Sequence, residues 1–159
     1  MKEKLREYIE NNLNIYNSIL SKSKSLDSCM IEACSISNYI ENEKQDNKFQ
    51  KMLFNYIDEK GIKDSDVYNK VNIDRRLFSK IRSDEDYHPS KETVILLGLS
   101  LELSLEEIEK FLNSASYSLP KNNVYDLIIR FCFINKIYDV FEVNDLLSEY
   151  NCKLIGFAS

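Results

Sequence analysis

The 159-residue chain is poor in residues that make turns, with 3 glycines and 2 prolines. All-β folds and glycine-rich phosphate loops both need such residues in quantity, so the composition favours helices. There is one histidine, His88, which precedes a proline in a polar segment. Nothing in the sequence marks a partner that would tune its pKa for acid–base chemistry, so we expect a structural role. No nucleophile or paired-carboxylate motif is present, and we expect neither a catalytic residue nor an enzyme.

Long apolar runs are also missing. The longest apolar stretch, Val124 to Phe133, contains Asp126 and Arg130 and is too short to cross a bilayer. The first residues mix lysine with glutamate and have no apolar segment behind them, unlike a secretory signal. We therefore expect a cytoplasmic protein with no membrane partner.

Cysteines are few and widely spaced. Cys29, Cys34, Cys132 and Cys152 form no pair with the two-residue spacing of a zinc or redox motif. Cys29 and Cys34 are five residues apart, which is off register for one helix face. We expect reduced, semi-buried thiols, with no bound metal and no cofactor.

Excess positive charge is absent as well, because the formal net charge is -5. That value argues against an extended, non-specific nucleic-acid binder, which would be basic overall. It leaves room for a local basic face, since salt screens charges beyond a Debye length. Hydrophobic residues make up 43% of the chain, which is enough for a packed core and argues against global disorder.

The apolar periodicity divides the chain into three segments. Residues 1–46 are predicted to form a helical hairpin, 47–116 a domain of short helices, and 117–159 a C-terminal helical extension with an apolar tail. The hairpin is predicted from two stripes at helical spacing: Leu5, Tyr8, Ile9, Leu13, Tyr16, Ile19 and Leu20, then Leu26, Met30, Ala33, Ile36 or Ser37, and Ile40. A lone hairpin buries little surface, so it docks on the rest of the chain or on a second copy. We favour a homodimer over docking within the chain.

Capping residues mark the short helices of the middle segment. The predicted signals are Gly61 as a C-terminal cap, Asn72 in a tight turn with positive φ, Asp74 and Ser90 as N-caps, and Ser104 with Glu107 as a capping box. In the C-terminal extension, apolar periodicity predicts helices over about Val124 to Asn135 and Val143 to Tyr150. The aromatic residues of this extension are predicted to pack in the core: Tyr125, Phe131, Phe133, Tyr138 and Phe141.

The segment from Asp64 to Arg82 has the pattern of a helix-turn-helix motif. In such a motif one short helix packs across a second, whose N-terminal residues enter the major groove of DNA. Val67, Val71, Ile73, Phe78 and Ile81 are the expected internal positions. The candidate DNA-binding residues, on the outward side or ends of the second helix, are Arg75, Arg76, Ser79, Lys80 and Arg82. We expect Arg75 and Arg76 to meet bases or phosphates, and Ser79, Lys80 and Arg82 to meet phosphates. The alternative for the four charged residues is an ordinary solvated or salt-bridged surface position, and for Ser79 it is a small polar residue at a helix crossing.

Three runs in this region carry a family resemblance: Ser79 to Arg82 (SKIR), Pro89 to Thr93 (PSKET) and Leu103 to Glu107 (LSLEE). In order and spacing they resemble the lambda-repressor/Cro helix-turn-helix family. Further runs, such as Asn72 to Arg75 (NIDR) and Tyr138 to Asn144 (YDVFEVN), are similar to a bacterial, mostly Gram-positive subgroup of C-terminal helix-turn-helix modules of poorly defined role. The resemblance implies an all-α, lambda-repressor-like bundle with extra C-terminal helices. The basic residues of the motif, rather than the resemblance, favour a role in transcription regulation.

Departures from the family pattern leave two functions open. Tyr68 stands where the family has a small residue, so its side chain is expected to swing outward or open the helix crossing. Asp84, Glu85 and Asp86 acidify the loop after the second helix and would repel phosphate. We favour a regulator that binds double-stranded DNA. The alternative is a protein–protein interaction module that keeps the fold without binding DNA.

Overall fold

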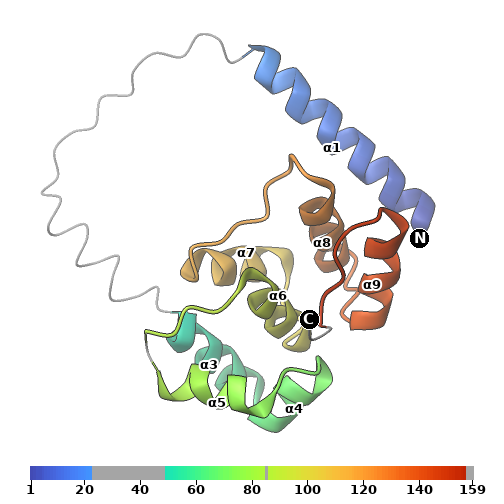
Figure 1. Cartoon of the computed structure of the whole chain (residues 1–159). Helices are drawn as coiled ribbons and strands as arrows, with labels where there is room; N and C mark the ends of the chain where they lie inside the picture. Colours follow the sequence, from blue (N-terminus) through green and yellow to red (C-terminus); the bar gives the residue numbers. More distant parts are fainter. Residues whose placement is uncertain (23–48, 85, 157–159) are drawn as a thin grey trace, which may run out of the picture.

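The computed structural model describes residues 1–22, 49–84 and 86–156, and all regular structure within these ranges is helical. The helices, in chain order, are α1 (Lys2–Lys22), α3 (Phe49–Lys60), α4 (Asp64–Lys70), α5 (Arg75–Ser83), α6 (Lys91–Ser100), α7 (Leu105–Ser114), α8 (Val124–Ile134) and α9 (Val140–Glu149) (Figure 1). The predicted all-α class is confirmed. The second predicted apolar stripe, Cys29, Cys34, Glu85 and Phe157 lie outside the described residues.

Helix α6 is the centre of the core. Every residue from Thr93 to Ser100 is buried, and the helix packs against α4 on one side and α7 on another (Figure 1). Gly98 permits this close approach, because a Cβ atom there would overlap the Ile108 side chain of α7. The Ser100 hydroxyl donates a 2.6 Å hydrogen bond to the Val67 carbonyl of α4 and so joins the core to the predicted motif.

Local capping chemistry sets most helix boundaries as predicted. The Asp74 and Ser90 side chains accept from the backbone N–H groups of Arg76 and Thr93, at 2.6 and 3.2 Å. Ser104 and Glu107 form a complete capping box. Gly61 and Asn72 have φ values of 61° and 54°, which lie in the left-handed region.

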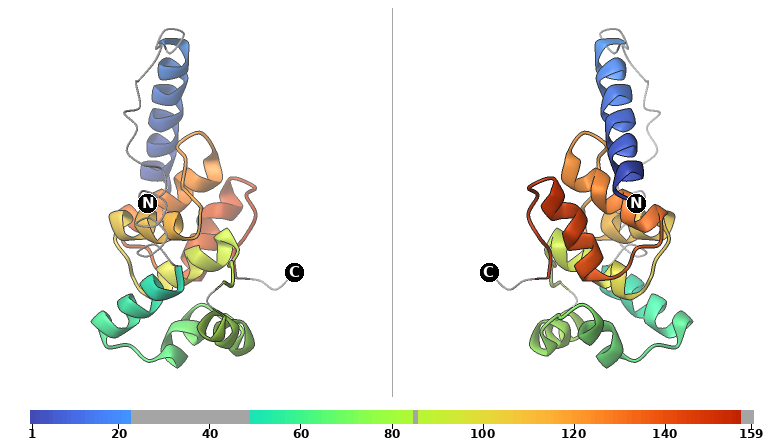
Figure 2. Two further views of the ribbon diagram at one scale, coloured as in Figure 1. Left: turned by 90° about the vertical axis from the view of Figure 1, so that its left-hand side faces the viewer. Right: turned by 90° about the vertical axis from the view of Figure 1, so that its right-hand side faces the viewer.

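Helix α1 docks on α8 through its first half. Leu5 and Ile9 are buried, and the Tyr8 ring lies 5.7 Å from that of Phe131. The second half of α1 extends past the rest of the protein (Figure 2). Leu5 and Ile9 are therefore covered by α8 of the same chain. For the stripe to which they belong, we favoured cover by a second copy on the basis of the sequence.

The C-terminal extension differs from prediction at two points. Helix α9 begins at Val140 rather than Val143, because Asp139 caps it by accepting from the N–H groups of Phe141 and Glu142. Phe141 is 67% exposed, so the prediction that it packs in the core is wrong. Phe131 and Phe133 are buried as predicted.

The described cysteines, Cys132 and Cys152, are free thiols, the first buried and the second half-buried. Burial raises the pKa of Cys132 to about 12, so its thiol stays protonated at neutral pH. None of the helices in the described ranges is long and apolar enough to cross a membrane.

Candidate nucleic-acid interface

A tight turn fixes α5 on α4. Asn72 takes the left-handed conformation between the two helices, and the Ile73 N–H donates to the Tyr68 carbonyl at 2.9 Å. Val67 of α4 is buried, as are Val71 and Ile73 in the turn, so these side chains anchor α4 and the turn in the core. This is the helix–turn–helix order that the sequence predicted.

The inner face of α5 packs on aromatic rings. Phe78 and Ile81 are buried, and the Phe78 ring lies 5.4 Å from Tyr68 and 6.2 Å from Phe54. Tyr68 is half-buried and rests on Phe78. The expectation that its ring swings fully outward is therefore wrong, because the ring packs on Phe78 between α4 and α5.

Gln50 of α3 anchors the C-terminal end of α5. Its side-chain amide donates to the carbonyls of Ile81 and Arg82, at 2.9 and 2.7 Å. Carbonyls in the last turn of a helix have no partner within that helix, so the contact fixes where α5 ends. The sequence carries no local signal for it, because Gln50 lies more than thirty positions away.

The outer face of α5 is positively charged. The helix carries four basic residues and no carboxylate between Arg75 and Ser83. At 3.6 residues per turn, the exposed residues Arg76, Ser79 and Lys80 lie on the side opposite Phe78 and Ile81, and the exposed Arg75 lies at the edge of that side. Within the described residues, the Arg75 and Arg76 side chains have no ion-pair or hydrogen-bond partner. These two guanidinium groups can therefore bind a ligand without breaking a contact seen in the structure.

Two of the five candidate residues have partners within the chain. Arg82 forms an ion pair with Asp64 of α4, with 2.5 Å between Nη2 and Oδ2, and its guanidinium lies 4.1 Å above the Phe54 ring. Lys80 places its ammonium group 4.9 Å from the centre of the Tyr87 ring. The structure thus brings Arg75, Arg76 and Ser79 together as side chains without a polar partner in the described part of the chain, and Arg82 is tied to the scaffold.

Carboxylates lie beyond the C-terminal end of α5. Asp84 and Asp86 are both exposed, and the Asp86 N–H donates to the Asp84 carboxylate at 3.1 Å. Asp74, at the other end, uses its carboxylate to cap the helix. Charge therefore changes along α5, from basic in its first two turns to acidic just after its last.

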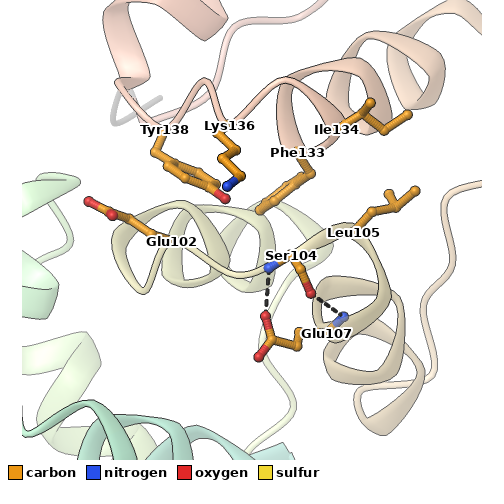
Figure 3. A pocket seen from close by; sticks show the side chains of 8 residues that line it. All are labelled: Glu102, Ser104, Leu105, Glu107, Phe133, Ile134, Lys136 and Tyr138. Carbon is orange, nitrogen blue, oxygen red and sulfur yellow. Dashed lines mark hydrogen bonds between the residues drawn. The ribbon is translucent and has the colours of Figure 1, made fainter.

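A hollow in the surface lies elsewhere, between the start of α7 and the turn from α8 to α9. It has a volume of about 530 Å³ and is lined by Glu102, Ser104, Leu105, Glu107, Phe133, Ile134, Lys136 and Tyr138 (Figure 3). Ser104 and Glu107 bond to each other's backbone, and Glu102 pairs with Lys70 at 2.5 Å. These polar groups thus already have partners, and the hollow brings together no nucleophile and base. No cluster of potential metal ligands occurs among the described residues.

Comparisons of the chain with protein-family models, curated proteins and solved structures find no match. The function is therefore argued from the α5 surface itself.

Proposed function

We propose that the chain is a DNA-binding protein, a transcriptional regulator whose α5 enters the major groove. The observation that carries the proposal is the exposed face of α5, where Arg75, Arg76, Ser79 and Lys80 lie together with no carboxylate among them. A major groove admits one α-helix, and arginine recognises guanine with two hydrogen bonds. The proposal includes a cytoplasmic location, where the protein has access to DNA.

The proposal assigns different roles to the residues of this face. Arg75 and Arg76 lie in the first turn of α5, where a recognition helix meets base edges and phosphates. Ser79 and Lys80 lie one turn later and would contact the phosphate backbone. Arg82, held by Asp64 and Phe54, positions α5 and reaches phosphate only from the edge of the surface.

Selection of genomic DNA fragments near physiological salt tests the proposal. We expect wild-type protein to enrich specific fragments. Replacing Arg75 and Arg76 together by alanine should weaken binding to them by about 1–3 kcal/mol for each lost pair of hydrogen bonds. Replacing both by lysine should restore general affinity and leave specificity impaired, because lysine lacks the planar fork.

A matched control removes two positive charges elsewhere. Lys4 and Arg6 are exposed on α1, and their joint replacement by alanine should change DNA binding only by the small effect of net charge. Lys80→Ala should weaken all sequences alike and reduce the slope of log affinity against log salt by about one unit. If the folded wild-type protein enriches no fragment, the DNA-binding proposal is wrong.

A protein–protein interaction module is the second candidate. It is favoured by the exposed carboxylates of Asp84 and Asp86 beside α5, and by the engagement of Arg82 within the chain. On this hypothesis no DNA is enriched, and a basic partner surface recognises the acidic loop. Binding of that partner would fall when Asp84 and Asp86 are replaced by asparagine and would survive Arg75→Ala.

A further inference from the structure

The second half of α1 is an exposed, charge-free helical surface. From Asn11 to Ile19 the sequence is NNLNIYNSI, with no acidic or basic residue. Ile15 and Ile19 are each 58% exposed, and their spacing of four places them on one face of the helix. Most aliphatic residues of the described chain are buried, and Ile15 and Ile19 are more exposed than the other exposed aliphatic residues, Ile134 at 46% and Leu154 at 38%.

This surface continues the stripe that docks on α8. Tyr8 contacts Phe131, and Asn12, Ile15 and Ile19 follow on the same side about one, two and three turns further on. The Asn122 side chain reaches the Tyr16 hydroxyl at 3.5 Å, which marks where the body of the protein ends beneath α1. Beyond that point the helix projects outward (Figure 2), and its apolar face has no cover from α8.

We infer that a second copy of this chain covers the face formed by Ile15 and Ile19, in a twofold dimer. Charge is the argument for this occupant. The chain carries a net charge of -5, so two copies repel over most of their surface and approach most easily where charge is absent. Interface cores are depleted of charged residues, and a twofold interface uses the same patch on both partners. An antiparallel pair sets Ile15 of one copy against Ile19 of the other.

The geometry sets the strength of this dimer. The nine residues span about 13 Å at a rise of 1.5 Å per residue, so two such faces bury less than the roughly 1,000 Å² of a stable interface. The dimer is therefore weak, with a dissociation constant on the order of micromolar. The inference deepens the proposed function, on which its biological consequence rests: a twofold dimer presents two copies of α5 to one duplex.

Sedimentation of the full chain, without DNA, tests the inference. We expect wild-type protein to shift from monomer to dimer between about 1 and 300 µM, the range of weak association. Ile15→Lys with Ile19→Lys should remain monomeric throughout. The matched control is Asn14→Lys with Asn17→Lys, which adds the same charge to exposed positions away from the isoleucine face and should keep most of the dimer.

Each other outcome overturns the inference. A monomeric wild type, or a dimer that the isoleucine variant does not weaken, means that no second copy sits on this face. A monomeric wild type whose melting temperature falls in the isoleucine variant shows that the face is covered within the chain. Ile15→Ala with Ile19→Ala, which favours the helix, should raise the dissociation constant at least tenfold and so excludes misfolding as the cause. Because the sedimentation experiment contains no DNA, a monomeric wild type leaves the proposal of DNA binding by α5 intact. Conversely, a protein that dimerises but enriches no DNA overturns only the DNA-binding proposal.

Discussion

At the scale of single residues, the capping box of α7 links stability to pH. The Ser104 N–H donates to the Glu107 carboxylate at 2.6 Å, and the Glu107 N–H donates to the Ser104 hydroxyl at 3.3 Å. The hydrogen bond from the Ser104 backbone, followed by that from its hydroxyl, lowers the pKa of Glu107 below its usual 4.5. The ionised carboxylate is therefore favoured in the folded state.

We predict that Ser104→Ala lowers the free energy of unfolding by about 1 kcal/mol at neutral pH, the usual value of an N-cap. Because the folded pKa of Glu107 is depressed, its contribution is present above pH 4.5 and is lost as the pH falls through the folded value. In Glu107→Gln, the free energy of unfolding should therefore fall less steeply as the pH is lowered, because this contribution is absent. Urea titrations at neutral and acidic pH measure both effects. Ser118→Ala, at an exposed serine, is the control, and an equal loss there would mean that the box contributes nothing.

Residue-level predictions from sequence succeed where the chemistry is local. Asp74, Ser90 and Asn72 act on backbone groups within three positions, so their roles follow from neighbours in the chain. Arg82 is different, because its partner Asp64 lies a whole motif earlier and is brought near only by the turn. Sequence alone therefore marks Arg82 as a candidate phosphate contact, whereas the structure shows it tied to the scaffold.

At the scale of elements, the C-terminal tail is fixed by one buried side chain. Asn144 of α9 accepts from the Ile155 N–H at 2.8 Å and donates to the Ile155 carbonyl at 2.9 Å. Glu92 of α6 adds a bond from the Gly156 N–H at 3.1 Å and an ion pair with Lys153 at 3.0 Å. The tail thereby joins α9 to the central helix, with Ile155 buried beneath it.

We predict that Asn144→Ala destabilises the protein, because both backbone groups of Ile155 lose their partner in a buried place. Each unpaired group costs about 1–3 kcal/mol, unless the tail detaches into water. Thermal unfolding measures the first outcome, and hydrogen exchange at the Ile155 amide reports the second. Asp145→Ala, at the exposed neighbour, should change neither measurement. Unaltered stability and exchange in Asn144→Ala would contradict this role.

Element boundaries depend on which of several possible caps the chain uses. Apolar periodicity alone predicted that the last helix starts at about Val143. The cap at Asp139 lengthens α9 by one turn and leaves Phe141 exposed on it. An aspartate three residues before a glutamate is a local signal that would have located this start.

At the scale of the whole molecule, the all-α class follows from few glycines and prolines together with helical periodicity. The docking of α1 does not follow from the sequence in this way. An apolar stripe shows that one face of a helix must be buried, but it does not show which element buries it. Leu5 and Ile9 pack against α8, whereas Ile15 and Ile19 lie beyond the part of α1 that α8 covers. Which half of one stripe is buried depends on the length of α1 relative to the body, and that is a property of the assembled fold.

The charge of the molecule gives a last prediction for DNA binding. Four cations on α5 act in a field set by a net charge of -5, with the carboxylates of Asp84 and Asp86 beside the helix. Coulomb's law gives about 0.5 kcal/mol for two charges 8 Å apart in water, so each carboxylate opposes a nearby phosphate by roughly a factor of two. Asp84→Asn with Asp86→Asn should therefore raise DNA affinity about two- to fivefold at low salt, for all sequences alike. The gain should vanish towards 1 M salt, where the Debye length falls to about 3 Å.

A control separates local from overall charge. Glu10→Gln with Asp145→Asn removes two exposed carboxylates from α1 and α9, away from α5 (Figure 1). Fluorescence titrations of a labelled duplex at several salt concentrations compare the two variants. If α5 is the helix in the groove, only the loop variant gains affinity beyond the small effect of net charge. Equal gains in both variants would show that DNA responds to the charge of the whole molecule, and that the end of α5 does not lie against the phosphates.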